Sequence, residues 1–215
     1  MARGKFITFE GGEGVGKSTQ ARLAAERLER QGIATVLTRE PGGTPFAEEV
    51  RDLLLGASHA PRGPLAEALL FYAARSDHLD RVIRPALAAG RWVVSDRFSD
   101  STRVYQNLAG GLTDEAFATL ERLVVAPTAP DLTLVLDIPP EEGLRRAALR
   151  RVADTGADRF EARTLDFHRQ LREGFLAVAA AEPERCVVID AAGAEAGVAA
   201  RVWAVLEARL LAGSA

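Results

Sequence analysis

A glycine-rich loop between an apolar run and a helix-like segment is the sequence feature that most constrains this chain. The loop has the spacing G-x4-G-K-S, formed by Gly11, Gly16, Lys17 and Ser18. The apolar run at 5–10 predicts a strand, and the spacing of apolar residues at 18–32 predicts a helix. Glycines let successive backbone N–H groups point at one anion, while the lysine adds positive charge and the serine hydroxyl suits Mg²⁺. The loop is therefore expected to bind a nucleoside triphosphate.

The rest of the chain alternates short apolar runs with helix-like stretches. Further strands are expected at 33–40, 91–96, 131–138 and 185–190, and further helices at 44–55, 63–90 and 197–211. Pro85 predicts a bend in the second of these helices. Parallel strands buried on both faces have this near-continuous apolar character. The pattern predicts an α/β fold with a parallel sheet of about five strands, and nothing in the 215 residues marks a second domain.

Composition narrows the cellular setting and the partners. The formal net charge is −3, which does not indicate a nucleic-acid-binding surface. The single cysteine, Cys186, is typical of a reducing compartment, and no apolar run reaches the length of a membrane helix. The N-terminal segment lacks the apolar region of a signal peptide. We therefore expect a cytoplasmic protein that does not bind nucleic acid or membranes.

Charged residues follow two of the expected strands. Asp96 ends the run WVVSD, where an acid near Mg²⁺ and phosphate is common in P-loop proteins. Arg97 follows directly, and a guanidinium recognises phosphate with two hydrogen bonds. Arg39 and Glu40 end the run at 33–40, before Pro41 and two glycines. Because the carboxyl ends of parallel strands line the ligand crevice, Arg97 indicates a second substrate that carries phosphate.

The segment LLFYAARSDH offers an aromatic ring and a guanidinium at helical spacing. Phe71 and Arg75 lie four residues apart and share one helix face, where a ring can stack on a base and an arginine can donate to its carbonyl. Taken alone, the stretch is more typical of a core phenylalanine and a surface arginine.

A polar insertion at 150–163 contains several arginines and a glycine. Such runs are usually solvated surface, but a closing lid can deliver cations to a phosphoryl group in transfer. We expect a lid at about 146–163 within the single domain of residues 1–215.

The order of these motifs resembles that of thymidylate kinases, which phosphorylate dTMP. The resemblance extends from FITFEGGEGVGKST through TREPGGT, LLFYAAR, VVSDRFSDSTRVYQ and PDLTLVLDIPPEEGLRRA to DRFE and VVIDA. It implies a three-layer fold like that of P-loop nucleoside monophosphate kinases. It also implies transfer of the γ-phosphoryl group of MgATP to dTMP, without a covalent intermediate or a strong general base.

The resemblance implies roles for individual residues. ATP would be bound by Gly11, Gly12, Glu13, Gly14, Val15, Gly16, Lys17, Ser18 and Thr19. The dTMP site would comprise Glu13, Arg39, Pro41, Phe71, Arg75, Arg97, Ser101, Thr102, Tyr105 and Gln106. Phe71 would stack on thymine, Arg75 would reach its O4, and Tyr105 would pack on the deoxyribose. Metal would be held by Ser18, Asp96 and Glu13.

Within the family, the catalytic arginine lies either in the P-loop or in the lid. This P-loop has no arginine, so the chain resembles the bacterial lid-arginine type. The expected catalytic residues are Lys17, Arg97, Arg150, Arg151 and Arg159, with Arg146 a further candidate. Membership of the family would also imply a homodimer. The apolar helices around 65–89 and 113–125 would supply its interface, and the alternative is that these residues belong to the core.

Other functions remain open at this level. A different P-loop kinase would act on another nucleoside monophosphate or on a nucleoside. A GTPase would need an N-K-x-D motif, but the only lysines are Lys5 and Lys17. A nucleotide-binding module without an acceptor would leave Phe71, Arg75 and Arg97 without a role.

Overall fold

The structure is a computed structural model and describes residues 3–56, 62–151, 160 and 163–212. Its strands form one parallel sheet in the order β2-β3-β1-β4-β5, as the sequence predicts. The strands are β1 (Phe6–Glu10), β2 (Thr35–Arg39), β3 (Trp92–Asp96), β4 (Leu132–Asp137) and β5 (Cys186–Asp190). The first strand lies at the centre, so the loop that follows it opens in the middle of the sheet.

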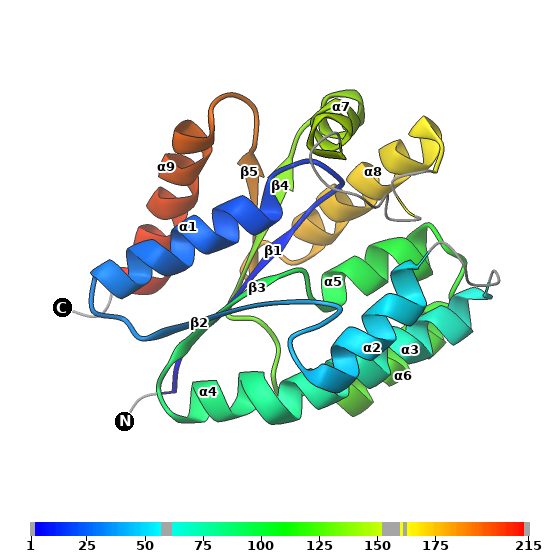
Figure 1. The fold of residues 1–215 in the computed structure, drawn as a ribbon, viewed down its shortest axis with the longest axis horizontal. Coiled ribbons are helices and arrows are strands. Elements are labelled where there is room, and N and C mark those ends of the chain that lie inside the picture. The colour runs from blue at the N-terminus through cyan, green and yellow to red at the C-terminus, as the bar shows by residue number, and fades with distance from the viewer. Residues whose placement is uncertain (1–2, 57–61, 152–159, 161–162, 213–215) are drawn as a thin grey trace.

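Helices cover both faces of the sheet and complete three layers (Figure 1). In the part of the chain that the structure describes, they are α1 (Lys17–Arg30), α2 (Pro45–Leu55), α3 (Pro64–His78), α4 (Arg84–Ala88), α5 (Ser99–Thr102), α6 (Asp114–Leu120), α7 (Pro140–Arg151), α8 (Leu165–Ala181) and α9 (Glu195–Leu206). Wider π-helical segments follow α3, α5, α6 and α9, at Leu79–Ile83, Arg103–Leu108, Glu121–Val125 and Glu207–Leu211. The predicted helix at 63–90 is thus α3 and α4 joined through such a segment, with Pro85 in the first turn of α4. None of the helices in the described ranges is long and apolar enough to cross a membrane.

Alternation along the central strand divides the core between the two faces. Ile7 and Phe9 pack with α1 and α9, whereas Phe6 packs with α3 and α4 on the opposite face. A third cluster joins α8 to the segment after α5. Because both faces are covered, the β1 residues are buried without exception, which explains the continuous apolar run.

The strand order places the site. The chain passes from β1 to β2 at the edge and returns with β3 between them, then continues to β4 on the other side of β1. This reversal of direction creates a crevice at the carboxyl ends of β1 and β3, where ligands of open α/β sheets bind. The P-loop leaves β1 at that point and Arg97 leaves β3.

Candidate active site

The P-loop closes tightly over the end of the sheet. Gly14 has a φ of 70°, and a Cβ there would lie 1.8 Å from the carbonyl oxygen of Gly143. Gly16 has a φ of 95° and begins α1, whose first N–H groups have no side-chain cap. These groups and the positive end of the helix are available to an anion. Any side chain at either glycine would distort the loop.

Lys17 lies across the P-loop and is buried. Its ammonium donates to the carbonyl oxygens of Gly12 at 2.6 Å and Gly11 at 3.2 Å. Burial, followed by the nearby charge of Arg97, lowers the pKa of Lys17 to about 8. The site therefore disfavours an extra positive charge until an anion compensates for it.

Ser18 and Asp96 lie side by side at the mouth of the loop. The serine hydroxyl donates to Asp96 Oδ2 at 2.5 Å, and Asp96 Oδ1 is buried without a hydrogen-bond partner among the residues described. Hydroxyl and carboxylate oxygens are the donors that Mg²⁺ prefers. No group of three or more acids, cysteines or histidines suited to a metal occurs in the described ranges.

A deep pocket opens beside the P-loop, between β1, α2, α3 and α5. Its lining consists of Glu13, Glu40, Pro41, Arg51, Leu55, Phe71, Arg75, Arg97, Phe98, Ser101, Thr102, Tyr105, Gln106 and Phe160. We call this the acceptor pocket. Of the residues predicted for dTMP, the fold brings all but Arg39 into this one lining, although they come from separate stretches of the chain.

Glu13 and Arg97 lie at the boundary between the P-loop and the acceptor pocket. Arg97 Nη2 lies 2.7 Å from Glu13 Oε1, while its Nη1 lies 3.3 Å from the carbonyl oxygen of Gly11. Tyr105 donates its hydroxyl to the same Glu13 oxygen at 2.6 Å. Burial alone would raise the pKa of Glu13, but the charges of Arg97 and Lys17 hold it at about 2. The carboxylate is thus ionised, and it faces the acceptor pocket.

Arg75 reaches the acceptor pocket from α3, one turn after Phe71. It is 2% exposed and donates from Nε to Glu40 at 2.7 Å and from Nη2 to Thr102 at 3.2 Å. Its Nη1 is buried and has no partner within the described ranges. A buried, unpaired donor in a pocket wall favours a ligand that presents a carbonyl oxygen.

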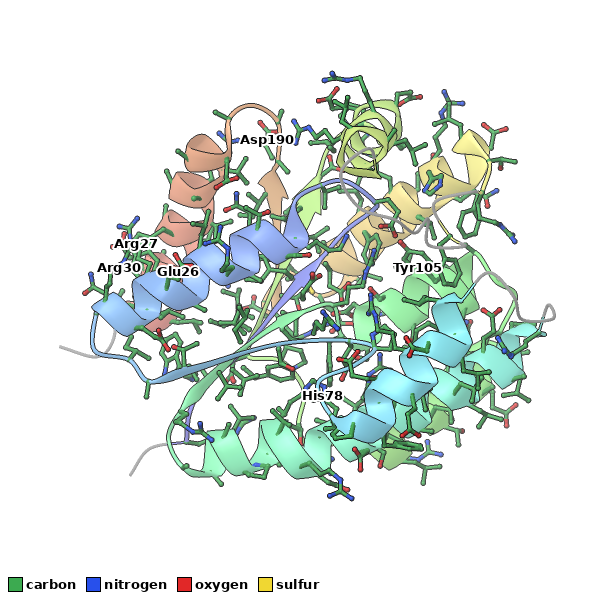
Figure 2. All side chains as sticks on the ribbon, in the orientation of Figure 1. Glu26, Arg27, Arg30, His78, Tyr105 and Asp190 are labelled. Carbon is green, nitrogen blue, oxygen red and sulfur yellow. The ribbon has the colours of Figure 1, made fainter. Side chains whose placement is uncertain are left out.

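Glu40 holds a second partner behind Arg75. Its other carboxylate oxygen lies 3.0 Å from His78 Nδ1, and His78 Nε2 lies 2.7 Å from the hydroxyl of Thr38. His78 is fully buried on the side of the sheet covered by α3 and α4 (Figure 2). Glu40, which directly follows β2, therefore connects β2 to the end of α3 through its contacts with Arg75 and His78.

Arg39 lies elsewhere. It pairs with Glu48 and lines a separate hollow together with Ser18 and Asp96, rather than the acceptor pocket. Arg51 contributes a guanidinium to the acceptor pocket instead, anchored on the carbonyl oxygen of Pro41 at 2.8 Å. The sequence prediction omitted Arg51, although its place four residues after Ala47 and three before Leu54 puts it on the buried face of α2.

Phe160 is another residue of the lining that the sequence prediction omitted. Its ring centroid lies 5.2 Å from that of Tyr105, in an edge-to-face contact. Arg159 and most of the predicted lid lie outside the described residues, as do the side chains of Arg150 and Arg151. Arg146 donates to Glu142 and to the carbonyl oxygen of Ala191, so it belongs to the contact between α7 and the end of β5.

A P-loop on the central strand, an acid at the end of the neighbouring strand and an adjoining pocket joined to the loop by an arginine define a P-loop kinase. The comparisons with known proteins identify which one. The thymidylate kinase family model matches residues 9–202. The chain belongs to the thymidylate kinase family.

Individual relatives agree with the family model. A thymidylate kinase of Rhodopseudomonas palustris is 54% identical over 210 residues, covering 97% of this chain and 91% of the relative. One of Bradyrhizobium diazoefficiens is 52% identical over 209 residues, with the same shares covered. The crystal structure of thymidylate kinase from Ehrlichia chaffeensis superposes with a TM-score of 0.76 at 34% identity, over 95% of this chain and 99% of that one.

Proposed function

We propose that this chain transfers the γ-phosphoryl group of MgATP to dTMP, with the P-loop as donor site and the acceptor pocket as dTMP site. As a thymidylate kinase, it uses ATP to phosphorylate dTMP, giving dTDP and ADP. The assignment of the two sites rests on the contacts of Arg97, which reaches Glu13 in the pocket wall and Gly11 in the loop. A phosphate in the acceptor pocket would therefore lie next to the triphosphate.

On the donor side, the loop N–H groups and Lys17 would hold the β- and γ-phosphates. The lysine would exchange its contacts with Gly11 and Gly12 for phosphate oxygens, and the oxygens of Ser18 and Asp96 fit a Mg²⁺ ion. When bound, the ion supplies charge neutralisation between the phosphates. Glu13 is already paired with Arg97 and Tyr105, so we assign it to the acceptor rather than to the metal.

On the acceptor side, the base would enter between Phe71 and the buried guanidinium of Arg75. Phe71 offers its ring for stacking, and Arg75 Nη1 offers a hydrogen bond to the base carbonyl. Thr102 and Gln106 border the base edge. Tyr105 would lie against the deoxyribose, where it disfavours a 2′-hydroxyl, and Glu13 would accept a hydrogen bond from the 3′-hydroxyl.

The phosphate of dTMP would lie between guanidinium groups. Arg97 provides one and Arg51 a second, both from the lining of the acceptor pocket. The predicted contribution of Arg39 to this phosphate remains a prediction, as do the catalytic roles of Arg150, Arg151 and Arg159. Because the attacking phosphate oxygen is already an anion, the residues act by positioning and by neutralising charge.

An acceptor panel tests the proposed function. Release of ADP from MgATP would be followed with dTMP, dUMP, dCMP, UMP, AMP and thymidine in turn. We expect dTMP to give the highest kcat/KM, because Arg75 suits a base carbonyl and Tyr105 disfavours a 2′-hydroxyl. Faster turnover with another monophosphate or with thymidine would overturn the substrate assignment.

We also propose a homodimer located in the cytoplasm. Leu69 on α3 and Leu123, in the segment after α6, are 51% and 71% exposed, and the two segments touch each other. A contiguous exposed apolar patch marks a site of protein–protein interaction, and we propose that these two leucines contribute to one. The single cysteine, Cys186, is a buried free thiol, which suits a reducing compartment.

A further inference from the structure

Arg97 has an unusual backbone for a residue that binds phosphate. Its φ is 70°, and it is the one non-glycine residue with positive φ in the described part of the chain. Such a conformation is strained for an ordinary L-residue. It persists only where the surrounding structure fixes it, so something must hold the turn that presents this guanidinium to the acceptor pocket.

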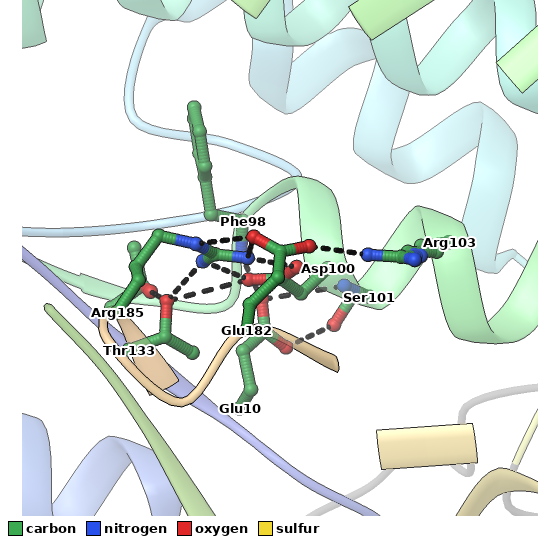
Figure 3. A network of polar contacts seen from close by, with 9 residues as sticks. Glu10, Phe98, Asp100, Ser101, Arg103, Thr133, Glu182 and Arg185 are labelled. Carbon is green, nitrogen blue, oxygen red and sulfur yellow. Dashed lines mark hydrogen bonds and ion pairs between the residues drawn. The ribbon is translucent and has the colours of Figure 1, made fainter. Parts of the chain in front are cut away.

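Glu10, the last residue of β1, holds that turn. Its Oε1 accepts the N–H of Phe98 at 2.7 Å and the N–H of Ser101 at 3.3 Å, while its Oε2 accepts the Ser101 hydroxyl at 2.6 Å. Figure 3 shows these contacts converging on one carboxylate. Phe98 precedes α5 and has no capping side chain of its own. Glu10 therefore takes the place of an N-cap, although it comes from a different element.

The same carboxylate reaches Arg97 through one intermediate. The Ser101 hydroxyl donates to Glu10 and accepts from Arg97 Nη1 at 3.1 Å. Glu10 thus holds the backbone that follows Arg97. Through Ser101 it also positions Nη1, one of the two terminal nitrogens of the Arg97 guanidinium. Glu10 itself is 0% exposed and is absent from the lining of the acceptor pocket, so it does not reach the acceptor.

A second acid strengthens the anchor. Asp100 follows in α5 and is held by both terminal nitrogens of Arg185, at 2.7 Å and 2.9 Å. Arg185 also donates to Thr133 on β4, and Figure 3 shows this group next to Glu10. Because Arg185 compensates the charge of Asp100, two buried acids can lie close together at the start of α5. The short helix is therefore fastened to the sheet at two points.

We propose that Glu10 is a positioning residue for phosphoryl transfer, which holds Arg97 in its strained conformation and aims it at the acceptor phosphate. The inference rests on the proposed function of the acceptor pocket. A purely structural Glu10 would instead stabilise the fold and leave the active site of the folded enzyme unchanged. The two roles differ in what happens to Arg97.

The test is a double-mutant cycle between Glu10→Ala and Arg97→Ala, with steady-state kinetics for dTMP and ATP. We expect Glu10→Ala to lower kcat on the order of 100-fold, as misplacement of a catalytic group does, with little change in the KM for ATP. In the Arg97→Ala background, the same change should cost almost nothing more. Additive effects, or a folded Glu10→Ala enzyme with normal kcat, would overturn the proposal.

Glu10→Gln and Thr8→Val complete the design. The glutamine keeps an oxygen for the two N–H groups, so kcat should remain within roughly threefold of the wild-type value. Thr8 lies two residues earlier on the same face of β1, fully buried and bonded to Thr133, and its valine variant should also keep normal kcat. If Thr8→Val lost as much as Glu10→Ala, general damage to β1 would explain both and the proposal would fail.

A structural readout does not depend on the reaction. Relaxation of the Arg97 side-chain ¹⁵Nε signal should show an ordered guanidinium in the wild type and in Glu10→Gln. If Glu10→Ala fails to fold, Ser101→Ala serves instead, and its Arg97 should be mobile. Unchanged order in either would contradict the proposal. A wild-type enzyme inactive on dTMP would refute the proposed function alone, since the relaxation measurement still decides the role of Glu10.

Discussion

Glu13 is the residue that distinguishes this P-loop from a simple phosphate cradle. A carboxylate is an unfavourable neighbour for phosphate, and the sequence alone does not say which way it points. In the structure it turns from the loop into the acceptor pocket, where Arg97 and Tyr105 bind it. With a pKa of about 2, it is ionised throughout the neutral range. In the proposed assignment, the backbone of this loop binds the donor and the Glu13 side chain binds the acceptor.

Replacement of Glu13 should affect the acceptor first. Glu13→Gln removes the charge that balances Arg97 and weakens the acceptor for a 3′-hydroxyl. We expect kcat/KM for dTMP to fall roughly 10- to 100-fold, equivalent to the loss of one charged hydrogen bond, with the Kd for ATP nearly unchanged. Steady-state kinetics with dTMP and calorimetric titration with ATP check this. A larger loss for ATP would mean that the acid serves the metal.

Lys17 should take up a proton when ATP binds. Its pKa is lowered to about 8 in the free site, and the triphosphate should return it to its usual range. ATP affinity is therefore expected to fall as the pH rises above 8. At pH 8, binding should consume about half a proton, which titration in two buffers of different ionisation enthalpy measures. Lys17→Arg does not titrate and should show no such uptake. Uptake of zero in the wild type would contradict the assigned environment.

Glu10 should make stability depend on pH in a recognisable direction. Burial, with the added charge of Asp100, raises its pKa to about 7, while Arg97 and two hydrogen-bonded residues oppose the shift. Lys17 on α1 also faces it. Because the folded pKa lies above the unfolded one, this contribution is complete below about pH 4.5 and is lost as the pH rises through 7.

Glu10→Gln removes that dependence. Relative to the wild type, the variant should gain roughly 2 kcal/mol in the free energy of unfolding between pH 5.5 and pH 8. Urea denaturation at the two pH values provides the measurement, and Thr8→Val is the buried control. A constant difference between variant and wild type across this range would show that Glu10 does not titrate there.

Among the elements, α3 carries the face that we propose binds the base. Phe71 and Arg75 are brought together by the four-residue spacing, and Arg75 is then fixed by Glu40 from the end of β2. The ring wall and the donor therefore belong to one rigid helix. This helix also holds the buried His78, which meets the same Glu40.

Removal of the Phe71 ring should weaken the binding of dTMP without affecting the binding of ATP. Phe71→Ala is expected to raise the KM for dTMP roughly 10- to 100-fold, in line with the loss of base stacking, and to leave the KM for ATP unchanged. Phe46→Ala is the matched control, because Phe46 lies exposed on α2 and outside the acceptor pocket, and it should behave as the wild type. An equal loss for both nucleotides in Phe71→Ala would show that Phe71 is a structural residue.

The sequence predicted the features that depend on a local pattern of residues, but not the contacts between residues far apart in the chain. Strands buried on both faces produce apolar runs, and the P-loop has a fixed spacing, so the sheet, its helices and the position of the loop were all predictable. The four-residue spacing predicted that Phe71 and Arg75 share one helix face, but it did not predict that Arg75 is buried. The contact between Glu40 and His78 joins residues that lie 38 positions apart in the sequence. The hydrogen bond between Glu10 and Ser101 joins residues 91 positions apart. No local pattern encodes such pairs, and the same limit explains why Arg51 was missed. The predicted contact of Arg39 with the dTMP phosphate stays a prediction.

In the molecule as a whole, the strand order of the sheet brings the residues of the two proposed substrate sites together. Placing β3 between β1 and β2 brings Arg97 beside the P-loop, so the two substrates can share one wall. Helices α2, α3 and α5 contribute residues to the acceptor pocket, and α1 begins at the P-loop that we propose as the donor site. The exposed leucines of α3 and of the segment after α6 lie outside the site.

That leucine surface yields a prediction for assembly. Sedimentation at micromolar concentration should give a dimer for the wild type, and Leu123→Glu should shift it to monomer, since a buried charge disfavours the interface. Leu149→Glu, at a residue 64% exposed on α7, is the control and should remain dimeric. A monomeric wild type would show that these leucines have another role.

We propose that one phosphoryl group passes from the P-loop nucleotide to dTMP in the acceptor pocket. Incubation with [γ-³²P]ATP, Mg²⁺ and dTMP, followed by separation of the nucleotides, tests it most directly. The wild type should transfer the label to dTDP, and Lys17→Ala should transfer almost none while remaining folded. Label found only in inorganic phosphate, or equal dTDP formation by Lys17→Ala, would contradict the account.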